Sequence, residues 1–459
     1  MSDPVTSTPR KTIWGRARAM ALAAPPQRNR YVDFLRALSI LAVVVGHWLV
    51  AAPYVDSSGA VQGGHLLGIL PWTQWLTWGF QVMPLFFLVG GFSNGVSWSA
   101  NMRQGGSYAH WFSSRFRRLI YPVLPLFALW TAIAMFGTVM GIDRAIVSMA
   151  AQLALIPVWF LSVYIMVTAV VPFTHAAWKR WGLGSFAALL AGAVAVDVLT
   201  LQFGVPGIRF TNFAFVWLAV HQLGYAWGDG YFARPTRALA WGLAGLAALL
   251  LLVFAGPYPV AMIGVPGSDL SNSMPPTIAL LALGIAQTGF ALALEPQARR
   301  MLDNIRIWTG VVLINGMIMS VYLWHLTAFV LVLIGAWLLG GLGLGVEPGS
   351  AAWWLARPIW FALYIALTLP LVMLFARYEQ APAHPKAAGK GDVPHWRLLL
   401  GLILACVGLG ATAVLSIASP EGVTGVRLWI VVLPFIGGAL VRFGRLYDLT
   451  ASPPPTPNA

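Results

Sequence analysis

Apolar runs of about 20 residues recur along most of this chain, and they limit its possible folds more than any other feature. A run of that length crosses the hydrocarbon core of a bilayer as a helix. Charged residues make up 9% of the sequence, whereas a soluble domain needs about a quarter to cover its surface. The spans must be helical, because an open sheet edge finds no hydrogen-bond partners in lipid. The sequence therefore predicts an all-α integral membrane protein and excludes a soluble one.

The apolar runs predict a polytopic bundle of about twelve transmembrane helices, a core of ten followed by a C-terminal pair. The expected spans are 34–53, 77–99, 119–141, 153–174, 183–203, 211–228, 238–258, 275–296, 308–338, 354–376, 398–418 and 427–441. The expected regions are a disordered basic cytoplasmic tail at 1–30, a membrane core at 31–377, a cytoplasmic linker at 378–397, the C-terminal helix pair at 398–441 and a disordered cytoplasmic tail at 442–459. We expect no soluble domain of useful size.

The formal net charge of +14 comes from short basic clusters between the apolar runs. A nucleic-acid-binding protein would gather such residues on one soluble face, so we expect no nucleic-acid partner. With the N-terminus inside, 23 Lys and Arg residues fall in cytoplasmic segments, and three, Arg144, Arg209 and Arg427, fall outside. Because Lys and Arg concentrate on the cytoplasmic side, the sequence predicts a bacterial-type inner-membrane protein with both termini in the cytoplasm.

The single cysteine, Cys406, lies within an apolar run, where it acts as a small buried residue. One cysteine supplies neither a disulfide nor a cysteine-based metal site. We expect no metal and no permanently bound cofactor.

Three further ionisable residues lie inside predicted spans. Asp197 and Arg357 both fall in the outer halves of their spans, and pairing across helices would remove two uncompensated charges. We expect a structural pair, with a role in lining the acceptor side as the alternative. His221 has no visible partner and is assigned no role.

The first span carries the most informative polar residues, Arg36 and His47, which are 11 residues apart. That spacing is three helical turns plus roughly 20°, so both side chains face one way, about 16 Å apart along the axis. A neutral imidazole facing the bundle interior can act as a general base. The alternatives are that His47 only hydrogen-bonds across helices, and that Arg36 extends to the interface or pairs with Asp33 at i,i+3.

Five short segments follow one another in an order that is typical of a known family. They are Asp33–His47 with the spacing D-x-x-R-x10-H, the glycine-containing segment 86–92, the basic segment 115–122, the W-F-L of 159–161 and the S-x-Y-L-W-H of 320–325. Together they resemble the acyltransferase-3 family, integral membrane O-acyltransferases. The chain departs from the family pattern at Gly90, where serine is usual.

The resemblance implies transfer of an acyl group, often acetyl, from cytoplasmic acyl-CoA to a hydroxyl of an envelope carbohydrate or lipid-linked acceptor. It implies that His47 activates this hydroxyl and that Arg36 with Arg115, Arg117 and Arg118 serves the donor. Guanidinium groups suit phosphate recognition, although the three arginines of the cluster also fit ordinary anchoring on the cytoplasmic side.

Other residues of the same segments are assigned supporting roles. We expect Gly90, Gly91, Ser93 and Asn94 to lie at the depth of Arg36 and to let the donor approach closely, with tight helix packing as the alternative. We expect Asp33, Tyr322, Trp324 and His325 to support the site or to lie on the acceptor side. His325 has three possible roles: orienting His47, binding the acceptor, or hydrogen-bonding with Tyr322.

Two other classes of function stay open. A transporter or flippase of an envelope lipid or sugar is compatible with many spans and buried charges, although no internal repeat is visible. A non-catalytic membrane scaffold would bind no acyl-CoA. The sequence leaves the oligomeric state, the acceptor and the acyl length open, and it allows an acyl-histidine intermediate as well as direct transfer.

Overall fold

A computed structural model describes residues 12–56, 59, 61–379, 393–419 and 424–442 of the chain. These residues are mainly helical, and the only strands among them are two of two residues each, which confirms the predicted all-α class. From the N-terminus the elements are α1 Ile13–Leu22, α2 Arg30–Val50, β1 Tyr54–Val55, β2 Val61–Gln62, α3 Leu66–Ile69, η1 Pro71–Leu76, α4 Thr77–Phe80, α5 Met83–Arg103, α6 Tyr108–Ile120, α7 Val123–Val139, α8 Arg144–Leu155, α9 Val158–Ala169 and α10 Val171–Trp181. They continue with α11 Leu183–Leu201, η2 Ile208–Thr211, α12 Asn212–Gly228, α13 Pro235–Phe254, α14 Ile278–Ala293, α15 Glu295–Met301, α16 Ile305–Asn315, α17 Ile318–Leu338, α18 Ala351–Phe375, η3 Ala376–Tyr378, α19 His395–Leu415 and α20 Leu428–Arg442.

The described helices include eight that are long and apolar enough to cross a membrane, or ten if two bent pairs each count as one span. The pairs are α8 with α9, bent by 41°, and α14 with α15, bent by 53°. This count is lower than the twelve predicted from the sequence. The predicted spans 211–228 and 427–441 form helices of only 17 and 15 residues. At 1.5 Å per residue, both fall below the roughly 30 Å thickness of the hydrocarbon core.

The predicted disordered tail is wrong for part of its length, because residues 13–22 form helix α1. Ala17 and Ala21 are buried, α1 packs against α16, and Trp308 donates a hydrogen bond from Nε1 to the carbonyl of Ala21 at 3.1 Å. Small residues allow this close contact, although the segment is too short to stand out as an apolar run. The rest of that tail (1–11), most of the predicted linker (380–392) and the second tail (443–459) lie outside the described residues.

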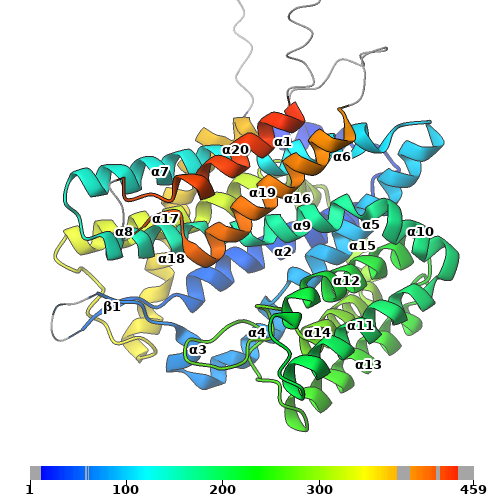
Figure 1. Ribbon diagram of the computed structural model, residues 1–459, viewed down its shortest axis with the longest axis horizontal. Coiled ribbons are helices and arrows are strands. Elements are labelled where there is room, and N and C mark those ends of the chain that lie inside the picture. Colours follow the sequence, from blue (N-terminus) through cyan, green and yellow to red (C-terminus); the bar gives the residue numbers. More distant parts are fainter. Residues whose placement is uncertain (1–11, 57–58, 60, 380–392, 420–423, 443–459) are drawn as a thin grey trace, which may run out of the picture.

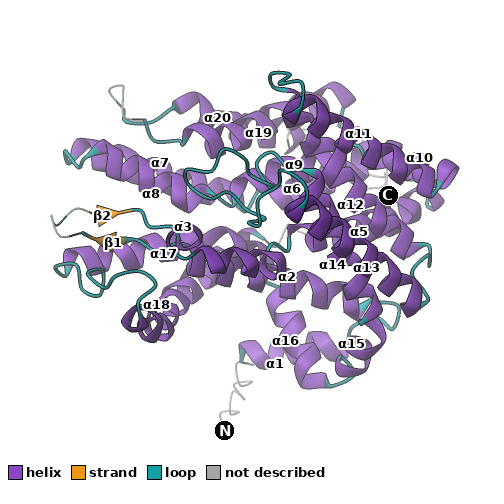
Figure 2. Ribbon diagram, turned by 90° about the horizontal axis from the view of Figure 1, so that it is seen from below, coloured by secondary structure: helices purple, strands orange, loops and turns teal. Residues whose placement is uncertain are grey.

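Helices α2 and α5 lie side by side and position the candidate site. Helix α2 also packs against α16 and α17, whereas α5 packs against α12 and α14. In Figure 1, helices α11 to α14 (green) lie together on one side of this pair, and α19 and α20 (orange to red) lie across α7 and α9. Figure 2 shows the same helices from below, with the short antiparallel strands β1 and β2 beside the loop that follows α17.

The backbones of α5 and α12 touch where glycine faces glycine. A Cβ added to Gly91 would overlap the carbonyl of His221, and one added to Gly224 would overlap the carbonyl of Leu88. Small residues let membrane helices approach this closely. Gly91, predicted to admit the donor, therefore serves the packing alternative.

The predicted pairing of Asp197 with Arg357 is wrong. The Asp197 carboxylate accepts hydrogen bonds from Asn212 Nδ2 at 2.7 Å, the Tyr258 hydroxyl at 2.8 Å and the backbone N–H of Ile278 at 2.9 Å. The Arg357 guanidinium instead lies over the ring of Trp353, 3.7 Å from its centroid. Each charge thus finds local polar or aromatic partners, which sequence position alone does not reveal.

Candidate active site

His47 and His325 form a hydrogen-bonded pair between helices α2 and α17. The Nδ1 atom of His47 lies 2.9 Å from Nε2 of His325, and the two rings are nearly parallel, with an interplanar angle of 7°. His325 is fully buried, whereas His47 stays partly accessible. Of the three roles considered for His325, the structure shows contacts that fit two: the orientation of His47 and a hydrogen bond with Tyr322.

The hydrogen bonds of the pair fix the tautomers of two neutral imidazoles. Nδ1 of His325 lies 2.7 Å from the carbonyl of Tyr322, and a carbonyl can only accept, so this Nδ1 carries the proton. Nε2 of His325 is then the acceptor, and Nδ1–H of His47 is the donor. The remaining Nε2 of His47 keeps its lone pair, which a general base requires.

Buried contacts hold the histidine pair in place. Trp48 donates from Nε1 to the carbonyl of His325 at 3.2 Å, and the Tyr322 hydroxyl donates to the carbonyl of Pro157 at 2.6 Å. The helix that carries His325 is fixed at its start, because the Glu379 carboxylate accepts hydrogen bonds from the N–H groups of Met319 and Ser320 and from the Ser320 hydroxyl. Glu379 thereby caps backbone N–H groups that have no partner within the helix at the N-terminus of α17.

His47 lines a cavity of about 190 Å³ at its end of α2. Helix α3, the segment from η1 to the start of α5, the loop before α14, and the side chains of Trp159 and Tyr322 complete the wall. Of the predicted site residues, His47 and Tyr322 line this cavity, and Arg36 and the basic cluster do not. Trp324 packs on Phe375, with ring centroids 3.8 Å apart, away from this cavity.

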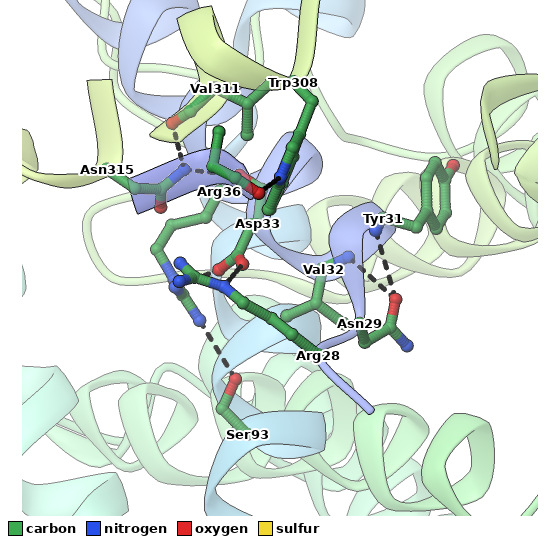
Figure 3. Close-up of polar contacts among 11 residues, drawn as sticks. Arg28, Asn29, Tyr31, Val32, Asp33, Arg36, Ser93, Trp308, Val311 and Asn315 are labelled. Atoms are coloured by element: carbon green, nitrogen blue, oxygen red, sulfur yellow. Dashed lines mark hydrogen bonds and ion pairs between the residues drawn. The ribbon is translucent and has the colours of Figure 1, made fainter. Parts of the chain in front are cut away.

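Arg36 belongs to a second polar group, toward the other end of α2 (Figure 3). The Asp33 carboxylate lies between two guanidinium groups, 2.6 Å from Arg28 Nε and 3.0 Å from Arg36 Nη1. The i,i+3 pairing of Asp33 with Arg36, which was considered as an alternative to a role of Arg36 in the site, is therefore present. Arg36 also donates from Nη2 to the Ser93 hydroxyl at 3.1 Å, which directs its head group toward α5.

Tyr164 of α9 lies between these two polar groups, and the sequence did not single it out. A Cβ added to Gly90 would lie 2.9 Å from the Tyr164 hydroxyl, so this hydroxyl sits against the backbone of α5. Asn94, Arg36 and Arg115 are close enough to act on it electrostatically. Along α5, Gly90 lies between Met83, which lines the cavity of His47, and Ser93, which bonds Arg36. It is about one turn from Ser93.

The other predicted donor-side residues have separate contacts. Asn94 Nδ2 also lies 3.2 Å from Nε2 of His221, so His221, which had been assigned no role, joins this buried polar group. Arg115 lies over the ring of Trp111, with 4.1 Å to the centroid. Arg117 donates to the carbonyl of Ser113 at 3.2 Å, and Arg118 is exposed. Of the basic cluster, the structure brings only Arg115 into the surroundings of Tyr164.

Comparisons with known proteins agree with the motif analysis. The model of the acyltransferase-3 family, described as an acyltransferase domain, matches residues 29–377. No curated protein and no solved structure matches the chain. The matched range includes the histidine pair, Asp33 with Arg36, the cavity and Tyr164, and it begins one residue after Arg28. Since the match covers most of the chain, this membrane protein belongs to the acyltransferase-3 family of acyltransferases.

Proposed function

We propose that the protein transfers an acyl group, acetyl by family precedent, from cytoplasmic acyl-CoA to a hydroxyl of an envelope carbohydrate or lipid-linked acceptor. The observation that carries this proposal is the hydrogen-bond order Tyr322 carbonyl, His325, His47, which leaves Nε2 of His47 as an unprotonated nitrogen. His47 is the general base, and His325 is a positioning residue that sets its tautomer.

The proposed reaction is direct transfer. Nε2 of His47 takes the proton of the acceptor hydroxyl as its oxygen attacks the thioester carbonyl carbon. The C–S bond then breaks, an ester forms, and the imidazolium returns the proton to the CoA sulfur. The bond between His47 Nδ1–H and His325 Nε2 stabilises the imidazolium while it exists.

The donor reaches His47 from the Arg36 end of α2, which faces the cytoplasm in this proposal. The heads of Arg36 and Arg115 suit the phosphates of CoA, because a guanidinium binds phosphate through two parallel hydrogen bonds. Asp33 pairs with Arg36, and the Ser93 hydroxyl directs the Arg36 head toward α5. The Tyr164 hydroxyl lies on the way from these heads to His47, where it can hydrogen-bond with the pantetheine arm or the thioester.

Mass spectrometry of envelope components from a deletion strain and a complemented strain tests the proposal. We expect acyl esters on one class of glycan or lipid to be absent from the deletion strain and restored by the wild-type gene. The gene carrying His47→Ala should not restore them, although the variant protein reaches the membrane. Unchanged esters in the deletion strain would contradict the proposal, and loss of surface export with esters intact would favour a transporter.

A further inference from the structure

The cavity beside His47 has an uncharged wall. None of its lining side chains is Asp, Glu, Lys or Arg. The lining is mainly aliphatic and aromatic, from Val43 on α2 to Phe80 on α4. A phosphate or carboxylate in this space would be buried without a counter-charge, which is unfavourable.

Most polar side chains of the wall already have partners within the protein. The Thr73 hydroxyl donates to the carbonyl of Leu70, and the Thr77 hydroxyl donates to that of Gln74. The Gln81 side chain bonds at both ends, to Met262 and Met83. The hydroxyls of Ser273 and Tyr322 are paired with Ser271 and with the carbonyl of Pro157.

Two side chains of the wall have a polar group with no hydrogen-bond partner among the described residues, namely Nε2 of His47 and the indole N–H of Trp159. The hydroxyls of Thr73, Thr77 and Tyr322 have used their donors and can only accept. A sugar ring has several hydroxyls within a few ångströms of each other, and most of them would stay unpaired in this space. The volume of about 190 Å³ is also below the roughly 300–1,000 Å³ of sites for drug-sized ligands, so only one end of an acceptor enters.

We propose that the cavity takes the reacting end of an uncharged alcohol whose surface next to its hydroxyl is apolar, of the chemical class of a lipid alcohol. This inference rests on the proposed function and narrows its acceptor. The hydroxyl of the alcohol donates to His47 Nε2 and accepts from the Trp159 indole, while its hydrocarbon part packs against the aliphatic wall. A sugar or phosphate of a larger acceptor stays outside the cavity.

The purified full-length protein with saturating acetyl-CoA tests the inference. CoA release and ester formation are measured with 1-hexanol, glucose and sn-glycerol 3-phosphate as acceptors. We expect kcat/KM for 1-hexanol to exceed that for each of the other two at least tenfold. Equal or better use of glucose or glycerol 3-phosphate would overturn the inference, and so would CoA release with none of the three. Acetyl-CoA binding, followed as thermal stabilisation of the protein, is a separate readout, and its absence would contradict the proposed function.

A pair of variants on α2 adds a matched control. Val43 lines the cavity, whereas the side chain of Leu41 is exposed on the outside of the same helix. We expect Val43→Asn to lower kcat/KM for 1-hexanol about tenfold and to leave the KM for acetyl-CoA unchanged. The ratio of kcat/KM for 1-hexanol to that for glucose should decrease. Leu41→Asn should keep wild-type kinetics. An unchanged preference in Val43→Asn, or an equal loss in both variants, would show that the cavity does not select the alcohol.

Discussion

The ring of Tyr164 lies directly on the backbone of Gly90, so that a Cβ added to this glycine would be 2.8 Å from ring atom Cε2 of Tyr164. Such a contact leaves no room for a side chain at residue 90. Because Gly90 lies between Met83 and Ser93 on α5, the Tyr164 hydroxyl lies between the histidine pair and the Arg36 group. Tyr164 belongs to α9, whereas these two groups are carried by α2 and α17.

Replacing Tyr164 with Phe should weaken donor use without loosening the fold. The ring packs against Phe86, Phe87 and Phe160, and Phe preserves these contacts. Loss of one hydrogen bond to the donor, worth about 1–1.5 kcal/mol, should lower kcat/KM for acyl-CoA roughly tenfold. The control is Tyr108→Phe, because the Tyr108 hydroxyl bonds the carbonyl of Ala169. Kinetics of Tyr164→Phe equal to those of the control would exclude the proposed role.

Removing the acceptor nitrogen of His325 should slow the chemical step. In His325→Leu the Nδ1–H of His47 loses its partner, so the preference for the reactive tautomer disappears. We expect kcat to fall by about 10–100-fold, the scale seen for hydrogen-bond partners that orient metal-binding histidines, with an unchanged KM for acyl-CoA. The pH–rate profile should also shift, because the imidazolium of His47 loses its acceptor. A normal kcat with a normal pH profile would reduce His325 to a packing residue.

Glu379 should give the stability of the protein a measurable pH dependence. Burial raises the pKa of the Glu379 carboxyl, although hydrogen bonds from Met319 and Ser320 oppose the rise. A raised pKa contributes stability that is fully present below the unfolded pKa, near 4.5, and is lost as the pH rises through the folded value. In thermal unfolding, the amount by which the Tm of the wild type exceeds that of Glu379→Gln should therefore decrease as the pH rises above 4.5. A constant difference across that range would contradict this prediction.

Asp197 and Arg357 should contribute independently to stability. Asp197 accepts three buried hydrogen bonds, so Asp197→Ala leaves donors unpaired and should cost about 2–4 kcal/mol. In a double-mutant cycle with Arg357→Met, measured by unfolding of the solubilised protein, we expect a coupling energy below about 0.5 kcal/mol. A coupling of several kcal/mol would restore the direct ion pair expected from the sequence.

The sequence predicted what depends on local spacing. Apolar run length predicts the helical class, and the i,i+3 spacing suggested the pairing of Asp33 with Arg36 as one alternative. The contact between His47 and His325 joins residues 278 positions apart, so a similar depth in the membrane could suggest it but not establish it. Tyr164 escaped notice because one phenol in an apolar helix is ordinary. The available signal was its position one turn after Phe160 of the W-F-L segment.

Acyl transfer by purified protein carrying His47→Ala tests the central claim most directly. The control is His110→Ala, because His110 is an exposed residue of α6 and its backbone N–H bonds the Ser107 hydroxyl, not the histidine pair. With acetyl-CoA and an alcohol acceptor, we expect His47→Ala to lose at least about a hundredfold in acceptor-dependent CoA release, the usual scale for a general base. It should keep acetyl-CoA binding, and His110→Ala should keep full activity. Turnover of His47→Ala close to that of the wild type would contradict the assignment of His47 as the base.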